Sequence, residues 1–256
     1  MKMDHIEVTD LTVTYDRKPV VWDLHFEVPK GVVAAIIGPN GAGKSTLIKA
    51  MIGLVPPNTG KVRFFGKTTD QMLGKIAYVG QRASIDWDFP ITAFEVVLMG
   101  LYGRLGWFKR PNKEHKQQVR NVLEKIGMSQ LADRQISDLS GGQQQRLFIG
   151  RALLQDADVY FLDEPFAGID ITTEKLIVDI LKELAAKGKT IFVVHHDLNT
   201  VESYFDWAIL LNMRLVAAGP LKEIYNSENL MKAFGQKGGL LEEAFLYAKG
   251  KQEGTK

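Results

Sequence analysis

Short apolar runs alternate with amphipathic stretches along this 256-residue chain. Residues 6–11 alternate between apolar and polar side chains, which predicts a strand with one buried face. Residues 32–37, 159–162 and 190–194 are instead almost entirely apolar, as expected for strands of a parallel sheet that is covered on both faces. The alternation of such strands with amphipathic helices predicts an α/β fold.

The middle of the chain, from about residue 82 to residue 127, has a different pattern. An acidic and aromatic loop at residues 84–90 leads into a helix at about residues 94–99. Residues 100–111 form an aromatic- and arginine-rich connector, and apolar residues at helical spacing predict a second helix over residues 113–126. We therefore expect a mainly helical insertion in this part of the chain.

Composition narrows the class of protein. Hydrophobic residues make up 45% of the chain and charged residues 24%, which suffices for one large domain or two tightly joined domains. The net charge of +2 is too small to favour a nucleic-acid or lipid surface. The chain has no cysteine for a disulfide framework, its start resembles a strand rather than a secretory signal, and no apolar run approaches the roughly 20 residues that span a bilayer. We expect a cytoplasmic domain that reaches a membrane only through a partner.

A phosphate loop is predicted at residues 38–46, which match the pattern G-x-x-x-x-G-K-[ST]. In such a loop, backbone N–H groups wrap phosphate oxygens at the N-terminus of a helix. Lys44 is expected to reach the β- and γ-phosphates, and Ser45 to ligate Mg²⁺. A dinucleotide-binding pattern does not fit, because Thr46 occupies the position of its third glycine. The candidate phosphate-binding residues are Gly38, Pro39, Asn40, Gly41, Ala42, Gly43, Lys44, Ser45 and Thr46.

Two acidic residues follow the apolar run at residues 159–162. The carboxyl end of a parallel strand lies beside the phosphate loop. Asp163 is therefore a candidate for binding Mg²⁺ through a water molecule. Glu164, one residue further along, is the candidate for polarising the attacking water. The alternative is a strand end capped by two solvated acids.

Adjacent histidines follow the run at residues 190–194. Neighbouring residues on a strand point to opposite faces, so His195 and His196 are not expected to share a metal ion. The other histidines are scattered, and no cluster has the spacing of metal ligands. We expect His195 to pack or to hydrogen-bond within the fold.

A second pair of glycines lies in residues 139–146, the sequence LSGGQQQR, which we call the signature segment. Taken alone, it is also typical of a polar turn before an amphipathic helix, with the glycines supplying positive φ. Two phosphate-handling glycine motifs in one short chain suggest a nucleotide clamped between two copies of it. Together with the phosphate loop and the Asp-Glu pair, the signature segment resembles that of the ATP-binding-cassette (ABC) ATPases.

The resemblance to ABC ATPases implies roles for further residues. Tyr15 matches the aromatic residue that stacks on adenine, and Gln81 matches the glutamine that contacts Mg²⁺ or water and reports to a partner. His196 matches the histidine that senses the γ-phosphate. Residues 167–170 match the loop across the dimer interface; they read AGID in place of the usual SALD, but Asp170 is retained. In the signature segment, the residues expected to contact the nucleotide of a second copy are Ser140, Gly141, Gly142 and Gln143.

The resemblance also predicts a P-loop NTPase core with an antiparallel β subdomain and an inserted α-helical subdomain at about residues 82–150. The ABC ATPase domain is expected to span residues 1–240, with short amphipathic helices after about residue 215 and a partly disordered tail at 241–256. The expected cofactors are ATP and Mg²⁺. The expected catalytic residues are Lys44, Gln81, Glu164 and His196, and the expected Mg²⁺ ligands are Ser45, Gln81 and Asp163.

Residues 81–92, and the apolar stretch at 96–100 that follows, closely resemble the manganese, zinc and iron importer ATPases of bacteria. The alternative is an acidic, aromatic surface loop without a partner. Trp87 and Phe89 are expected to anchor a helix of a membrane permease. DNA-repair and ribosome-bound cassettes carry coiled-coil insertions or two fused cassettes, which this sequence lacks.

We therefore expect the ATP-hydrolysing subunit of a bacterial ABC importer for a divalent metal ion, with manganese favoured by resemblance. The alternatives are an importer ATPase for zinc, iron or an iron chelate, and a soluble cassette that acts on an assembly scaffold. The expected partners are the permease subunits, a second copy of the chain in an ATP-bound head-to-tail dimer and, indirectly, an extracytoplasmic metal-binding protein, but no nucleic acid. The chain is expected at the cytoplasmic face of the cell membrane.

Overall fold

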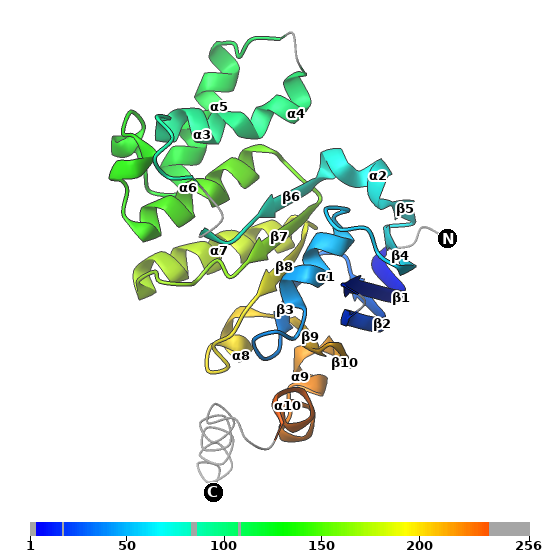
Figure 1. Ribbon diagram of the computed structural model, residues 1–256. Helices are drawn as coiled ribbons and strands as arrows, with labels where there is room; N and C mark the ends of the chain where they lie inside the picture. The colour runs from blue at the N-terminus through cyan, green and yellow to red at the C-terminus, as the bar shows by residue number, and fades with distance from the viewer. Residues whose placement is uncertain (1–3, 17, 83–85, 107–108, 236–256) are drawn as a thin grey trace, which may run out of the picture. The chain divides into compact units, whose positions relative to one another are not determined.

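The computed structural model describes residues 4–16, 18–82, 86–106 and 109–235. The chain forms two compact units: the first contains Met1–Leu73 and Thr190–Lys256, and the second contains Gly74–Lys189. Figure 1 labels the helices and strands of both units. The predicted α/β class is confirmed, because each unit combines strands with helices. The boundaries of the inserted subdomain at about residues 82–150 stay a prediction.

An antiparallel sheet in the first unit has the strand order β2-β1-β4-β5. Its strands are β1 (His5–Tyr15), β2 (Lys18–Pro29), β4 (Thr59–Phe64) and β5 (Lys67–Thr68). Along β1 the buried positions change phase between Val8 and Leu11. A bulge at this point, with Asp10 at φ 50°, inserts one residue, and it keeps Leu11 on the buried face.

The parallel strands of the first unit are β3 (Val33–Ile37), β8 (Thr190–Val194) and β9 (Trp207–Asn212). β3 pairs in parallel with both β8 and β9, and β10 (Arg214–Pro220) pairs with β9 in antiparallel fashion. Every residue of β3 and β8 is buried, which confirms the parallel, doubly covered strands that their apolar runs predicted. The phosphate loop follows β3 and leads into α1 (Lys44–Met51).

Short helices complete the first unit. They are α2 (Thr69–Met72), α8 (Val201–Tyr204), α9 (Leu221–Ile224) and α10 (Ser227–Phe234). The short helices predicted after about residue 215 are partly confirmed: they begin only at Leu221, because residues 215–220 belong to strand β10. Asn226 begins α10, because its Oδ1 accepts a hydrogen bond from the N–H of Asn229 at 3.0 Å. The tail predicted at residues 241–256 lies outside the described residues.

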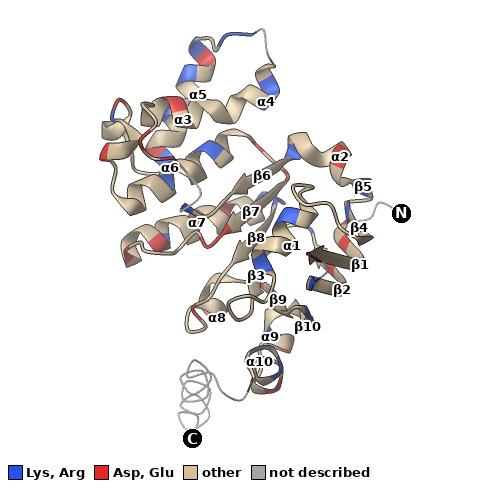
Figure 2. Ribbon diagram, viewed as in Figure 1, with Lys and Arg blue, Asp and Glu red and all other residues tan. Residues whose placement is uncertain are grey.

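The second unit is built around two parallel strands, β6 (Ile76–Val79) and β7 (Val159–Asp163). Its long helices are α5 (Lys113–Lys125), α6 (Gly141–Leu154) and α7 (Ile171–Ala186). α3 (Ala93–Leu98) and α5 pack on α6, and Figure 1 shows them side by side. Figure 2 shows both basic and acidic residues on α5 and α7, whereas the charged residues of α6 are all basic.

The two helices predicted in the middle of the chain are confirmed as α3 and α5. The prediction of a connector over residues 100–111 is partly wrong. The first part of this stretch is helical: it contains a 3-10 turn, η3 (Met99–Leu101), followed by the short helix α4 (Tyr102–Leu105). A Cβ on Gly100 would overlap the carbonyl oxygen of Arg151 in α6, so glycine lets this turn approach that helix. Within the residues that the structure describes, no helix is long and apolar enough to cross a membrane.

Candidate functional site

The phosphate loop adopts the backbone that its glycines permit. Gly41 and Gly43 have φ of 81° and 92°, in the left-handed region that residues with a Cβ rarely adopt. Gly43 is the N-cap of α1, so the loop ends where the N–H groups of the first helical turn become available. A Cβ on Gly38 would overlap the carbonyl oxygen of Leu211 in β9. The loop is therefore a narrow turn whose backbone can face a small anion.

Lys44 lies inside the phosphate loop. Its side chain is buried, and its Nζ donates hydrogen bonds to the carbonyl oxygens of Gly38 and Pro39 at 2.8 and 2.9 Å. From outside, the turn between β9 and β10 supports the loop, because the N–H of Met213 donates to the carbonyl of Ala42 at 3.0 Å. The loop thus holds a buried cation within a fixed backbone frame.

Tyr15 stands at the exposed end of β1, paired with Lys18 of β2, and 46% of its surface is accessible. A second aromatic residue of the same unit is equally accessible: Trp22 is 45% exposed, and the Cζ of Arg214 lies 4.0 Å from its ring centroid. Trp22 was not predicted as a site residue, although an aromatic side chain at an exposed position of a strand is a signal that the sequence contains. With 46% of its surface accessible, Tyr15 can be reached by a base, as stacking requires.

The adjacent histidines have different surroundings. His195 is buried beside Phe205, with the two ring centroids 5.1 Å apart, and its Nε2 lies 2.7 Å from the hydroxyl of Thr200. Burial, followed by the nearby ring of His196, lowers the pKa of His195 to about 4. This confirms the packing role expected for His195. His196 is exposed at the end of β8, where its ring can reach a ligand.

In the second unit, Gln81, Asp163 and Glu164 share one edge of the sheet. β6 and β7 run in parallel with Val79 opposite Leu162, so both strands end at the same edge. Asp163 is the last residue of β7 and is 2% exposed. The pKa of Tyr78 in β6 is raised to about 12, chiefly by burial and secondly by the charge of Asp163. Asp163 therefore acts electrostatically on the neighbouring strand. The structure therefore brings together three of the predicted site residues.

Glu164 has a strained backbone. Its φ of 54° lies in the left-handed region, which is uncommon for a residue with a long side chain. Its carbonyl accepts a hydrogen bond from the N–H of Ala167 at 3.2 Å, which closes a turn directly after the strand. The left-handed conformation of Glu164 turns the chain sharply after Asp163. The two consecutive acids therefore have different surroundings: Asp163 is buried and Glu164 is half-buried.

The signature segment caps α6. The Oγ of Ser140 accepts a hydrogen bond from the N–H of Gln143 at 3.4 Å, and the Oε1 of Gln143 accepts one from the N–H of Ser140 at 2.9 Å. This reciprocal pair is a capping box, and it fixes the first turn of the helix. Ser140 is exposed, and Gly141 and Gly142 are half-buried, so the N-terminal turn of α6 is accessible.

Asp170 caps α7. Its Oδ1 accepts from the N–H of Thr173 at 2.9 Å and its Oδ2 from the Thr173 hydroxyl at 2.7 Å. These hydrogen bonds, chiefly the one from the backbone N–H, lower the pKa of Asp170. The first turns of α6 and α7 are neighbours, because a Cβ on Gly142 would lie 3.5 Å from the Oγ1 of Thr173. The structure thus brings the signature segment together with the loop at residues 167–170.

The two aromatic residues expected to anchor a partner differ in exposure. Phe89 is 58% exposed, as expected. Trp87 is half-buried, with its ring edge-on to Phe148 of α6 at a centroid distance of 5.3 Å. Trp87 is therefore less accessible than Phe89, because its ring packs partly within its own unit, and docking at either side chain stays a prediction.

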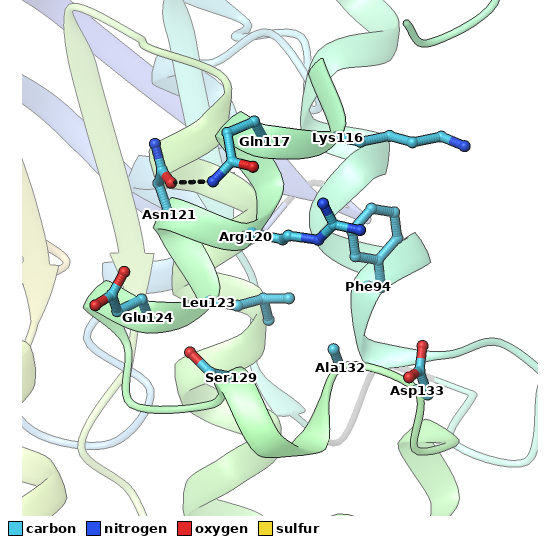
Figure 3. A pocket seen from close by; sticks show the side chains of 10 residues that line it. All are labelled: Phe94, Lys116, Gln117, Arg120, Asn121, Leu123, Glu124, Ser129, Ala132 and Asp133. Atoms are coloured by element: carbon cyan, nitrogen blue, oxygen red, sulfur yellow. Dashed lines mark hydrogen bonds between the residues drawn. The ribbon is translucent and has the colours of Figure 1, made fainter. Parts of the chain in front are cut away.

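A hollow of about 550 Å³ lies in the second unit (Figure 3). Most of its lining is polar and exposed, and the Nε2 of Gln117 donates to the Oδ1 of Asn121 at 3.0 Å. The lining residues are Phe94, Lys116, Gln117, Arg120, Asn121, Leu123, Glu124, Ser129, Ala132 and Asp133. No predicted site residue is among them.

The predicted site residues divide between the two units. The phosphate loop, Tyr15 and His196 belong to the first unit, whereas Gln81, the Asp-Glu pair, the signature segment and Asp170 belong to the second. Among the described residues, no group of three or more histidine or acidic side chains could hold a metal ion by itself. The first unit therefore offers anion binding by backbone amides and Lys44, and the second unit offers acids suited to activating water.

Comparison with known proteins assigns the family. The chain matches a family model described as ABC transporter over residues 21–167, more than half of its length. It is 54% identical over 230 residues to the zinc transport system ATP-binding protein TroB of Treponema pallidum (strain Nichols), covering 90% of this chain and 86% of that protein. It is 51% identical over 248 residues to the manganese transport system ATP-binding protein MntB of Bacillus subtilis (strain 168), covering 97% and 99%. The chain therefore belongs to the ABC transporter family, and it is an ATPase.

Solved structures confirm the predicted fold class. The chain is similar to a protein described as a metal-chelate type ABC transporter in an inward-facing conformation, with a TM-score of 0.79 and 28% identity over 90% of this chain and 89% of that one. It is also similar to an ATP-binding cassette in a dimeric post-hydrolysis state with ADP and phosphate, with a TM-score of 0.75 and 27% identity over 84% and 98%. The α/β ABC ATPase fold expected from the sequence is confirmed.

Proposed function

We propose that this chain is the subunit that hydrolyses ATP to power import of a divalent metal ion, with manganese as the favoured cargo. The observation that carries the proposal is the 51% identity to a manganese transport ATP-binding protein over nearly the full length of both chains. Zinc is the second candidate, because the TroB protein, named for zinc transport, is 54% identical. Both relatives are named as parts of transport systems, which favours this proposal over a soluble cassette that acts on a scaffold.

ATP binding begins with the phosphate loop. Backbone N–H groups of residues 38–46 wrap the phosphates, and the exposed ring of Tyr15 stacks on adenine. Lys44 exchanges its hydrogen bonds to the carbonyls of Gly38 and Pro39 for the β- and γ-phosphates. A charged amine already buried in the loop loses little further hydration in this exchange, so its attraction for the phosphates is strong.

Mg²⁺ fits the oxygen donors that the chain supplies. Asp163 presents a carboxylate at the end of β7, and Ser45 presents a hydroxyl in the first turn of α1. Mg²⁺ prefers such oxygen ligands to nitrogen or sulfur. We assign Ser45, Gln81 and Asp163 as the residues that would hold the ion, which would supply positive charge against the phosphates.

Hydrolysis requires an oriented water beside the γ-phosphate. We assign Glu164 to accept a proton from this water, because it is half-buried and its turn separates it from buried Asp163. The exposed imidazole of His196 contacts the γ-phosphate and stabilises the charge on its oxygens. Gln81, at the same sheet edge as the acids, positions the water and responds to the state of the nucleotide.

The signature segment completes the site of a second copy. Ser140 and the accessible N–H groups at the start of α6 form an anion-binding helix N-terminus, suited to the γ-phosphate held by another chain. When each of two copies places its signature segment against the nucleotide of the other, the pair forms a head-to-tail dimer with two nucleotides and two-fold symmetry. The similarity to a dimeric ATP-binding cassette supports this arrangement, with Asp170 beside the interface.

The membrane partner is a permease. We place its contact at Phe89, the exposed aromatic residue near Gln81, where an apolar side chain of a permease helix can bury it. The chain then acts at the cytoplasmic face of the membrane as a peripheral subunit. An extracytoplasmic metal-binding protein delivers the cargo to the permease and does not contact this chain.

Metal accumulation in cells tests the proposed cargo. Cells lacking the protein are expected to take up less radioactive manganese, and a plasmid copy of the wild-type chain restores uptake, whereas the Glu164→Gln variant does not. Uptake of radioactive zinc is measured in parallel. Loss of zinc uptake with normal manganese uptake selects zinc, and normal uptake of both ions contradicts the proposal.

A further inference from the structure

Arg82 follows Gln81 directly and is bound to the signature helix α6. Its Nε donates a hydrogen bond of 2.7 Å to the Oε1 of Gln144, which is buried. The Nε2 of Gln144 donates in turn to the carbonyl of Ile136 at 3.1 Å, just before the signature segment. A Cβ on Gly141 would lie 2.5 Å from Nη1 of Arg82, so glycine leaves room for the guanidinium at the first turn of the helix.

Arg82 and Trp87 form a second attachment to the same helix. The indole Nε1 of Trp87 donates to the carbonyl of Arg82 at 3.1 Å, and the Cζ of Arg82 lies 5.7 Å from the Trp87 ring centroid. Trp87 packs edge-on against Phe148, whose ring centroid lies 4.7 Å from the Cζ of Arg151. The guanidinium groups of Arg82 and Arg151 thus lie near the rings of Trp87 and Phe148, respectively. The π-faces of aromatic rings attract such positive charges.

These contacts all lie on one face of α6. Gly141, Gln144, Phe148 and Arg151 are spaced by three or four residues, so they line a single stripe of the helix. An α-helix is stiff along its axis, so a displacement applied to this stripe also moves the N-terminal turn that carries Ser140. The contacts therefore join the segment after Gln81 to the signature segment.

We infer that Arg82 is a positioning residue that sets the orientation of the signature helix from the segment after Gln81. This inference rests on the proposed function, in which the signature segment contacts a nucleotide held by a second copy. Movement of Phe89 by a docked permease then reaches the N-terminus of α6 through Arg82 and Trp87. In the opposite direction, the movement of α6 when two copies close on ATP is transmitted to the permease through the same contacts.

The test separates dimer formation from nucleotide binding in the purified full-length chain. Arg82→Ala and Arg82→Lys are each combined with Glu164→Gln, and the ATP-dependent dimer dissociation constant is measured by sedimentation. We expect Arg82→Ala to weaken the dimer on the order of tenfold, since residues that couple two sites typically change affinity by such amounts. Arg82→Lys recovers only part of the loss, because lysine lacks the guanidinium fork that reaches both Gln144 and Gly141.

The controls distinguish positioning from folding. Arg120→Ala removes another exposed arginine of the same unit, which lines the hollow in Figure 3, and it is expected to leave the dimer unchanged. ADP affinity is also expected to remain that of the parent chain in Arg82→Ala, whereas loss of the hydrogen bond to Gln144 lowers its thermal midpoint only slightly. An unchanged dimer constant, or a loss that only follows a lower thermal midpoint or weaker ADP binding, overturns the inference while leaving the proposed function intact. Failure of the parent Glu164→Gln chain to dimerise with ATP overturns the proposed dimer and the inference together.

Discussion

Gly142 of the signature segment lies against Asp170, the N-cap of α7: a Cβ placed on Gly142 would be 3.6 Å from the Oδ2 of Asp170. That distance is an ordinary van der Waals contact, so packing inside the unit leaves room for a methyl group. Glycine at this position is therefore not required by the folded chain itself. The proposed function supplies another reason, namely close approach of the helix N-terminus to a phosphate of a second copy.

Gly142→Ala tests this distinction. Because the methyl group fits and alanine favours a helix over glycine by up to about 1 kcal/mol, the thermal midpoint is expected to be unchanged or raised. ATP hydrolysis is nevertheless expected to fall strongly, since the methyl group occupies the space where the γ-phosphate must approach. Calorimetry and steady-state ATPase assays measure the two effects. A fall in stability that matches the loss of activity would show that Gly142 serves only the fold.

His195 gives the stability of the chain a specific pH dependence. Burial lowers its pKa to about 4 in the folded chain, against an ordinary value of about 6.5 in the unfolded chain. The unfolded chain therefore binds a proton first as the pH falls, and this contribution to stability is complete above about pH 6.5 and is lost progressively down to about pH 4, at up to about 1.4 kcal/mol per pH unit.

Urea unfolding at pH 7 and pH 5 measures this dependence in the wild-type chain and in His195→Gln. The substitution is expected to lower stability at pH 7, because it disturbs the packing against Phe205, and to flatten the loss between the two pH values. Glutamine cannot gain the proton that penalises the folded histidine. Identical pH dependence in both chains would show that another group causes the loss.

Lys44→Ala and Glu164→Gln are expected to separate binding from chemistry. Lys44→Ala removes the buried cation of the phosphate loop, so both ATP affinity and turnover fall. Glu164→Gln keeps the shape of the side chain and loses the base, so ATP still binds while turnover falls by about a hundredfold or more. Fluorescence titration with a nucleotide analogue, beside phosphate release, measures both quantities. Equal loss of nucleotide affinity in the two variants would remove the dedicated catalytic role from Glu164.

Trp87→Ala and Phe89→Ala are expected to have different effects. Phe89 is exposed, so its removal leaves the stability and ATP binding of the isolated chain unchanged and weakens assembly with the permease. Removal of Trp87 takes away its contact with Phe148, so it destabilises the chain by about 1–3 kcal/mol as well. Chemical unfolding and co-purification with the permease measure the two effects. Normal assembly with Phe89→Ala would exclude this side chain from the docking contact.

The elements that could be predicted from the sequence are those with a strong local signal. β3 and β8 are continuous apolar runs, and α5 places Val119 and Leu123 at helical spacing, so their burial follows from the pattern. The phosphate loop is equally local, because the positive φ of Gly41 and Gly43 depends on glycines that stand in the motif itself.

The features that were missed depend on residues distant in the sequence. Trp87 is half-buried because Phe148 lies beside it in space, and no periodicity near Trp87 indicates that contact. The hydrogen bond between Arg82 and Gln144 joins residues 62 positions apart. The bulge at Asp10 is indicated locally in the sequence by the change of phase between Val8 and Leu11. The alternation alone, however, does not indicate which residue is inserted. Tertiary packing, rather than local propensity, decides such features.

Manganese transport by the assembled complex tests the central claim most directly. The wild-type chain and Glu164→Gln are each reconstituted with the permease and its metal-binding protein in liposomes, with ATP on the side that this chain faces. The account predicts ATP-dependent accumulation of radioactive manganese with the wild-type chain, and uptake reduced by about a hundredfold or more with Glu164→Gln despite normal ATP binding. Equal manganese accumulation by the two complexes, or none by the wild-type complex while it hydrolyses ATP, would contradict it.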